Sequence, residues 1–177
     1  MIDISFIVTC EEQQQQELRR MLPDLLSMQH EGELEVIVVD KQHDKDMTEW
    51  LEEKEVHHPN LSHTFCPASA RGIDIHRLAL TLGAKSSNYE WLVILPADIS
   101  LQDEGWLPKL ASCCSNDIDI AIGIPSGKRR LNWLTSYLLR RRFSLFRPTS
   151  FVILCRRSIL LQDRPIKQMS SKEIVKL

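Results

Sequence analysis

The sequence is poor in glycine and lacks the motifs that glycine builds. Only 6 of the 177 residues are glycine, and the chain contains no G-x-G-x-x-G, G-x-x-x-x-G-K-[ST] or G-x-S-x-G pattern. The first two patterns cradle the phosphates of dinucleotides and nucleoside triphosphates, and the third exposes the serine nucleophile of α/β-hydrolases. The sequence therefore argues against a nicotinamide enzyme, a P-loop enzyme and an α/β-hydrolase.

Cysteines and long apolar runs are also scarce. None of the 5 cysteines is spaced C-x-x-C, which argues against a disulfide scaffold and a structural zinc site. The first residues lack the basic stretch and cleavage site of a signal peptide, and no apolar run approaches the about 20 residues that cross a bilayer. We expect a cytoplasmic protein, and attachment to the inner face of the membrane stays open.

The net charge of −2 hides a strong asymmetry between the two parts of the chain. Residues 128–177 carry 13 Lys and Arg against 2 Asp and Glu, a net charge of +11. Residues 1–127 carry 9 against 22, a net charge of −13. A basic segment on an acidic body indicates contact with a polyanion. The alternative is a solvated basic face that neutralises the acidic part within the fold.

Apolar runs of strand length alternate with helix-length segments. The expected strands cover residues 4–9, 35–40, 61–66, 90–95, 118–124 and 150–155. The expected helices cover residues 11–29, 44–55, 69–85 and 103–114, with Ser69 as a candidate cap and a short helix after Cys155. This alternation predicts an α/β fold, a three-layer sandwich around a mostly parallel, Rossmann-like sheet. We expect one domain over residues 1–162, followed by a polar tail at 163–177.

Acidic residues follow several of the expected strands. Asp40 and Asp98 stand directly at strand ends, and Glu12 lies a few residues beyond the first strand. Ligands of parallel α/β sheets bind beyond the carboxyl ends of the strands. Carboxylates there could hold Mg²⁺ or Mn²⁺ against a diphosphate, or hydrogen-bond a base or ribose. The alternative is that these acids only cap the helices that follow.

The first two strand segments carry recognisable motifs. Residues 4–12 are similar to I-I-V-P-T-Y-N-E, with Thr9 and Glu12 matching, and residues 35–40 are similar to E-V-I-V-V-D-D-G-S, with Asp40 matching the first acid. These are motifs of family 2 glycosyltransferases, which the chain therefore resembles. Lys41-Gln42-His43 stands where the D-G-S of that motif is expected.

Two further segments extend the resemblance. Ala70-Arg71 matches the first two positions of A-R-N, and Asp98 matches the last acid of the metal-binding D-x-D, with Pro96 in place of the first. Residues 145–160 resemble the D-P-T-S-G-F…R-R-x-x-L stretch of polyprenyl-phosphate sugar transferases. The matching residues there are Pro148, Thr149, Ser150, Arg156, Arg157 and Leu160, and Arg147 replaces the Asp.

The resemblance implies a nucleotide-diphospho-sugar transferase (GT-A) fold and a hexosyltransferase-type activity. Residues 1–127 would bind a UDP- or GDP-linked sugar, and the basic residues 128–162 would lie on the acceptor side, with a polyprenyl phosphate as an implied acceptor. Thr9, Glu12 and Asp40 would hold the nucleotide, Arg71 the diphosphate, Asp98 the Mg²⁺ or Mn²⁺ ion, and Arg147 the acceptor. The catalytic base is not identified, and Asp163 is the only nearby candidate.

Two other hypotheses stay open. The departures in three motifs fit a relative that has lost catalysis and serves as a partner subunit or scaffold. The basic segment also fits a module that binds an anionic lipid or membrane surface. Nucleic acid is not expected, because a basic groove with stacking aromatics is not apparent. The oligomeric state is not predicted.

Overall fold

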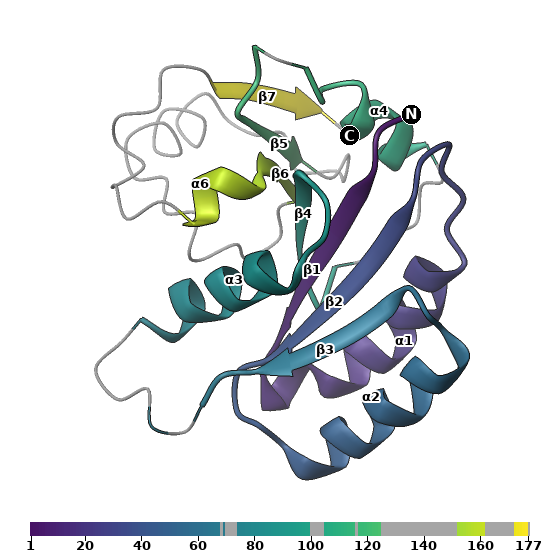
Figure 1. Cartoon of the computed structure of the whole chain (residues 1–177), viewed down its shortest axis with the longest axis vertical. Helices are drawn as coiled ribbons and strands as arrows, with labels where there is room; N and C mark the ends of the chain where they lie inside the picture. The colour runs from purple at the N-terminus through teal and green to yellow at the C-terminus, as the bar shows by residue number, and fades with distance from the viewer. Residues whose placement is uncertain are drawn as a thin grey trace.

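The structure, a computed structural model, describes residues 1–67, 69, 74–99, 105–115, 117–124, 152–161 and 172–176. Seven strands of these residues form one sheet in the order β3-β2-β1-β4-β6-β5-β7. The strands are β1 (Ile4–Cys10), β2 (Leu34–Asp40), β3 (Leu61–Phe65), β4 (Trp91–Pro96), β5 (Ile120–Ile124), β6 (Val152–Arg156) and β7 (Lys172–Lys176). Figure 1 shows the sheet running through the middle of the molecule.

The sheet is mostly parallel, as predicted. The parallel pairs are β1–β2, β1–β4, β2–β3 and β5–β7, whereas β6 runs antiparallel to both β4 and β5. The parallel strands β1 to β4 therefore all end at the same edge of the sheet. The near-continuous aliphatic sequences of β1 and β4 are buried, as expected for strands that are covered on both faces.

Helices lie between and beside these strands, and α2 and α3 begin after aspartates that cap them. The helices are η1 (Glu12–Gln14), α1 (Gln15–Leu26), α2 (Lys45–His57), α3 (Ile75–Ser86), α4 (Trp106–Ala111) and α6 (Arg157–Leu161). Asp44 caps α2 by accepting from the Met47 amide, and Asp74 caps α3 by accepting from the amides of His76 and Arg77. Aspartate at these positions satisfies amides that have no partner within the helix.

Two apolar layers enclose the sheet and confirm the three-layer sandwich. One face packs against α1, α2 and α4, and the rings of Phe6 and Trp106 meet there at 6.0 Å between centroids. The opposite face packs against α3 and α6. Figure 1 shows α1 and α2 on one side of the sheet and α3 on the other. The alternation of side chains along β1 explains this division, because successive residues point to opposite faces.

Close packing fixes α3 and the strand edges. A Cβ atom on Gly83 of α3 would lie 2.6 Å from Cγ2 of Ile7 in β1, so only glycine allows this approach. On β2, the Glu35 carboxylate accepts from the Ser5 hydroxyl at 2.6 Å and from the amide and side chain of Asn88, each at 2.7 Å. This carboxylate thus joins β1, β2 and the turn before β4.

Two features differ from the prediction, and a third lay outside it. Helix α3 begins after Asp74, not at Ser69, because the Asp74 carboxylate reaches two amides of the first turn. Strand β6 is antiparallel, a direction that periodicity does not encode. Residues 172–176 form β7 beside β5 instead of belonging to a polar tail. Its two apolar residues, Ile174 and Val175, were too few to indicate a strand.

Candidate functional site

The carboxyl ends of four parallel strands bring the predicted acids to one edge of the sheet. Cys10 pairs in register with Asp40, and Asp40 pairs with Phe65 of β3. On the other side of β1, Thr9 pairs with Pro96, the last residue of β4. Strands β2 and β4 both adjoin β1, so their backbones lie about 10 Å apart, two strand spacings of ~4.8 Å. Asp40 and the turn that carries Asp98 therefore face the same edge.

The Asp40 side chain is hydrogen-bonded to the loop that follows β2. Its side chain is buried, with the residue 4% exposed. One carboxylate oxygen accepts from the Gln42 amide at 2.9 Å, and the other accepts from the Asp44 amide at 2.6 Å. Asp40 thus shapes the β2–α2 loop and delivers Asp44 to its capping position. It does not itself cap α2.

A charged cluster that sequence reasoning missed lies beside Asp40. The Lys41 ammonium donates to a Glu11 carboxylate oxygen at 3.0 Å and lies 2.8 Å from Nδ1 of His76. The Lys41 side chain is only 7% exposed. An ammonium group has no acceptor, so Nδ1 of His76 accepts and its Nε2 carries the ring proton. The cluster links β1, β2 and the first turn of α3.

The pKa of Glu11 reflects this arrangement. The hydrogen bond from Lys41 lowers the pKa of the Glu11 carboxyl below its ordinary value of 4.5, and the charge of Lys41 lowers it further against the effect of burial. Glu11 also closes a capping box with Gln14 at the start of η1. The signal for Lys41 was present in the sequence, since it replaces an acid at the end of a buried strand.

Two aromatic rings lie at the same edge, also unforeseen. The rings of His43 and Phe65 are stacked, with centroids 3.6 Å apart and planes inclined by 4°. His43 is exposed and has a positive φ of 56°, and Phe65 is 39% exposed. The ring pair therefore presents an aromatic surface to solvent beside the β2–α2 loop.

Asp98 lies in a turn immediately after β4. The Ile99 amide donates to the Pro96 carbonyl at 3.2 Å, and Asp98 is exposed within this turn. In the part of the chain that the structure describes, no three His, Cys, Asp or Glu side chains gather to hold a metal. An exposed carboxylate still suits Mg²⁺ or Mn²⁺ that arrives with a diphosphate, because such ions take one or two carboxylates and complete their shell with phosphates and waters.

The other predicted site residues divide into two groups. Thr9 is buried near the end of β1, and Glu12 is exposed in the η1 turn that follows it. Both therefore lie at the same edge as Asp40. Arg71, Arg147 and Asp163 lie outside the described residues.

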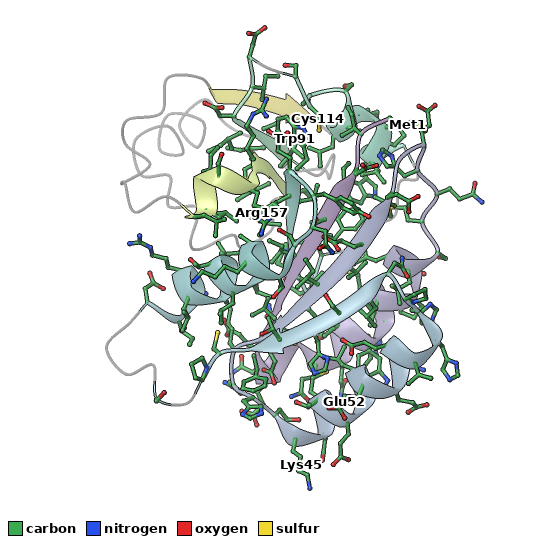
Figure 2. All side chains as sticks on the ribbon, in the orientation of Figure 1. Met1, Lys45, Glu52, Trp91, Cys114 and Arg157 are labelled. Carbon is green, nitrogen blue, oxygen red and sulfur yellow. The ribbon has the colours of Figure 1, made fainter. Side chains whose placement is uncertain are left out.

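The two arginines that matched the polyprenyl-phosphate pattern are placed away from this edge. Arg156 pairs in register with Trp91, the first residue of β4, and lies over its ring at 4.5 Å. Its guanidinium also binds Glu90 and the Ser115 carbonyl. Arg157 donates to the carbonyls of Ala84 and Lys85 at the end of α3, where Figure 2 shows it. Both side chains therefore join elements of the fold at the amino end of β4.

The buried thiol at the edge is not a nucleophile. Burial, with the nearby charge of Asp40, raises the pKa of the Cys10 thiol to about 12. A thiol is reactive as its thiolate, so Cys10 stays protonated and inert at neutral pH. Among the described residues, the groups at this edge that are suited to contact a ligand are carboxylates, Lys41 and the ring pair.

The fold is the α/β fold of glycosyltransferases, as the solved structures show. The chain is similar to S. aureus TarS 1–349, with 16% identity, a TM-score of 0.64, and coverage of 90% of this chain and 48% of that one. It is likewise similar to the mannosyltransferase PcManGT from Pyrobaculum calidifontis, solved with GDP-Man and Mn²⁺, with 17% identity, a TM-score of 0.63, and coverage of 89% and 45%.

A further structure of TarS 1–349, solved with UDP, matches with 19% identity, a TM-score of 0.55, and coverage of 73% of this chain and 38% of that one. The chain thus spans less than half of the length of each of these structures. No protein-family model and no curated protein sequence matches the chain. Among the described residues, no helix is long and apolar enough to cross a bilayer.

Proposed function

We propose that this chain binds a nucleoside diphosphate sugar at the carboxyl edge of β1, β2 and β4 and acts in transfer of the sugar to an acceptor. The observation that carries the proposal is the convergence of Asp98, Lys41 and the Asp40 loop at one edge of a glycosyltransferase-type sheet. Two matching structures were solved with GDP-Man and Mn²⁺ or with UDP, which supports this class of ligand.

The charges at the edge suit a diphosphate and its metal ion. Asp98 would bind a divalent ion, which supplies positive charge to the diphosphate leaving group. Lys41 has three N–H donors, and Glu11 and His76 take two of them. We propose that the third meets an oxygen of the nucleotide. The Glu11 carboxylate lies 3.0 Å from this ammonium group and pairs with it.

The roles of the other predicted site residues are proposed partly from the structure and partly from the sequence alone. Thr9 and Glu12 would contact the nucleotide from the end of β1, and Asp40 would act by holding the β2–α2 loop, since its two oxygens already accept amides. Arg71 on the diphosphate, Arg147 on the acceptor and Asp163 as a base rest on the sequence alone.

A polyprenyl phosphate remains the proposed acceptor. A phosphate monoester has a second pKa near ~6, so its oxygen attacks without a catalytic base. Because Arg156 and Arg157 bind elements of the fold, recognition of this phosphate would fall to the basic residues between 128 and 151. Incubation with a labelled sugar nucleotide and a polyprenyl phosphate tests this directly. Label that stays entirely in the aqueous phase would contradict the proposed acceptor.

Calorimetric titration tests the proposed function. We expect UDP-glucose or GDP-mannose to bind the wild-type chain, more tightly with Mn²⁺ than without it. Asp98→Asn should remove the gain from Mn²⁺ and leave the metal-free affinity unchanged. Asp24→Asn is the matched control, since Asp24 is exposed on α1 away from the site. Absence of binding to any nucleotide sugar, with and without Mn²⁺, would overturn the proposal.

A further inference from the structure

The stacked rings of His43 and Phe65 lie where a bound nucleotide would meet the β2–α2 loop. Phe65 is the last residue of β3 and pairs in register with Asp40, and His43 follows Asp40 by three residues. The rings therefore belong to the same sheet edge as Lys41. Together they offer a flat aromatic surface.

The backbone around His43 is held firmly in an unfavourable conformation. The amides on both sides of it, those of Gln42 and Asp44, donate to the Asp40 carboxylate, and Asp44 is in turn fixed as the cap of α2. Between them His43 has a φ of 56°, the left-handed region that glycine and asparagine adopt at lower cost. Strain of this kind at a residue with an exposed side chain points to a use for that side chain.

Stability does not account for the ring pair. The gain from one aromatic stack is of the same order as the cost of a non-glycine residue in the left-handed region, so the two nearly cancel. Both rings also remain exposed, so they contribute little hydrophobic stabilisation through burial. Glycine or asparagine at position 43 would keep the loop at less cost. The ring itself is what histidine adds.

From this we infer that the His43–Phe65 ring pair is the surface on which the nucleobase stacks. The inference rests on the proposed function, because it assigns the base of the same nucleotide. A planar base can extend a stack whose planes are already parallel to within 4° at a 3.6 Å spacing. The phosphates of the nucleotide would then lie toward Lys41. Lys41 follows Asp40, whose carboxylate holds the β2–α2 loop. Because any base can stack on an aromatic ring, the pair would increase affinity for the nucleotide without selecting between uracil and guanine.

Two variants remove the rings without disturbing the loop. His43→Asn keeps a residue that tolerates positive φ, and Phe65→Leu keeps an apolar side chain without a ring. We expect each variant to weaken binding of UDP and GDP by about 5- to 150-fold, the range for loss of one base–aromatic stack. Binding of pyrophosphate, which has no base, should be unchanged. His57→Asn, at the exposed end of α2, is the matched control and should bind like the wild type.

NMR titration of the wild-type chain gives a second test, once the ring protons of His43 are assigned. Addition of UMP to the wild-type chain should shift the His43 ring resonances in the NMR spectrum, and ribose 5-phosphate should not. Unchanged nucleotide affinity in both variants, or equal weakening of UDP and pyrophosphate, would overturn the inference and leave the proposed function standing. A wild-type chain that binds no nucleotide would overturn both.

Discussion

The hydrogen bonds of Asp40 make a strong prediction about the loop after β2. In Asp40→Asn, one of the two carboxylate oxygens becomes an NH₂ group that faces a backbone amide and cannot accept from it. A hydrogen bond to a charged acceptor contributes about 1.5–3 kcal/mol, so the variant should lose about that much free energy of unfolding. For a chain of this length the loss corresponds to a fall of roughly 3–12 °C in Tm.

Urea unfolding followed by tryptophan fluorescence measures this loss. The slope of the transition should match that of the wild type, because the fold and the surface exposed on unfolding are unchanged. Asp98→Asn is the matched control, since Asp98 is exposed in a turn, and its stability should stay within about 0.5 kcal/mol of the wild type. If Asp40→Asn also left the free energy of unfolding unchanged, the Asp40 oxygens would not stabilise the loop. Direct contact with a ligand would then explain the position of Asp40 better.

Three further predictions concern packing, charge and thiol chemistry. Gly83→Ala should destabilise the chain by up to about 2 kcal/mol despite the better helix propensity of alanine, because its Cβ meets Ile7; thermal unfolding of equal or greater stability would contradict this. Because the pKa of Glu11 is lowered, its stabilising effect is complete above about pH 4.5 and is lost as the pH falls below that value. Lys41→Met should therefore flatten the fall in stability below about pH 4.5; an unchanged pH profile would refute the ion pair. Burial raises the pKa of Cys155 to about 12, so a thiol reagent should modify Cys155 of the native chain only at the rate of unfolding, as mass spectrometry of the labelled peptide would show; rapid labelling would disprove its burial.

The sequence predicted the sheet well because its strands are covered on both faces. Such strands are near-continuous aliphatic runs, and β1, β2 and β4 were each located to within about one or two residues, as helix and strand ends usually are. The polar ends of these runs predicted an edge with several acids. Strand β7 and the antiparallel direction of β6 could not be read in this way, because pairing partners are set by contacts between distant segments.

The site was predicted less completely than the fold. Sequence position placed Asp40 and Asp98 at strand ends, but it could not show that backbone amides occupy both oxygens of Asp40 while Asp98 stays exposed. That difference depends on loop geometry. The stacking of His43 on Phe65 was equally hidden, because the two residues meet through the pairing of β2 with β3.

A crystal structure of the chain soaked with a sugar nucleotide and Mn²⁺ tests the central claim most directly. The account predicts nucleotide density beyond the carboxyl ends of β1, β2 and β4, with the metal ion against Asp98 and the base over the His43 ring. Density for the nucleotide at any other surface, with this edge occupied by solvent alone, would contradict it.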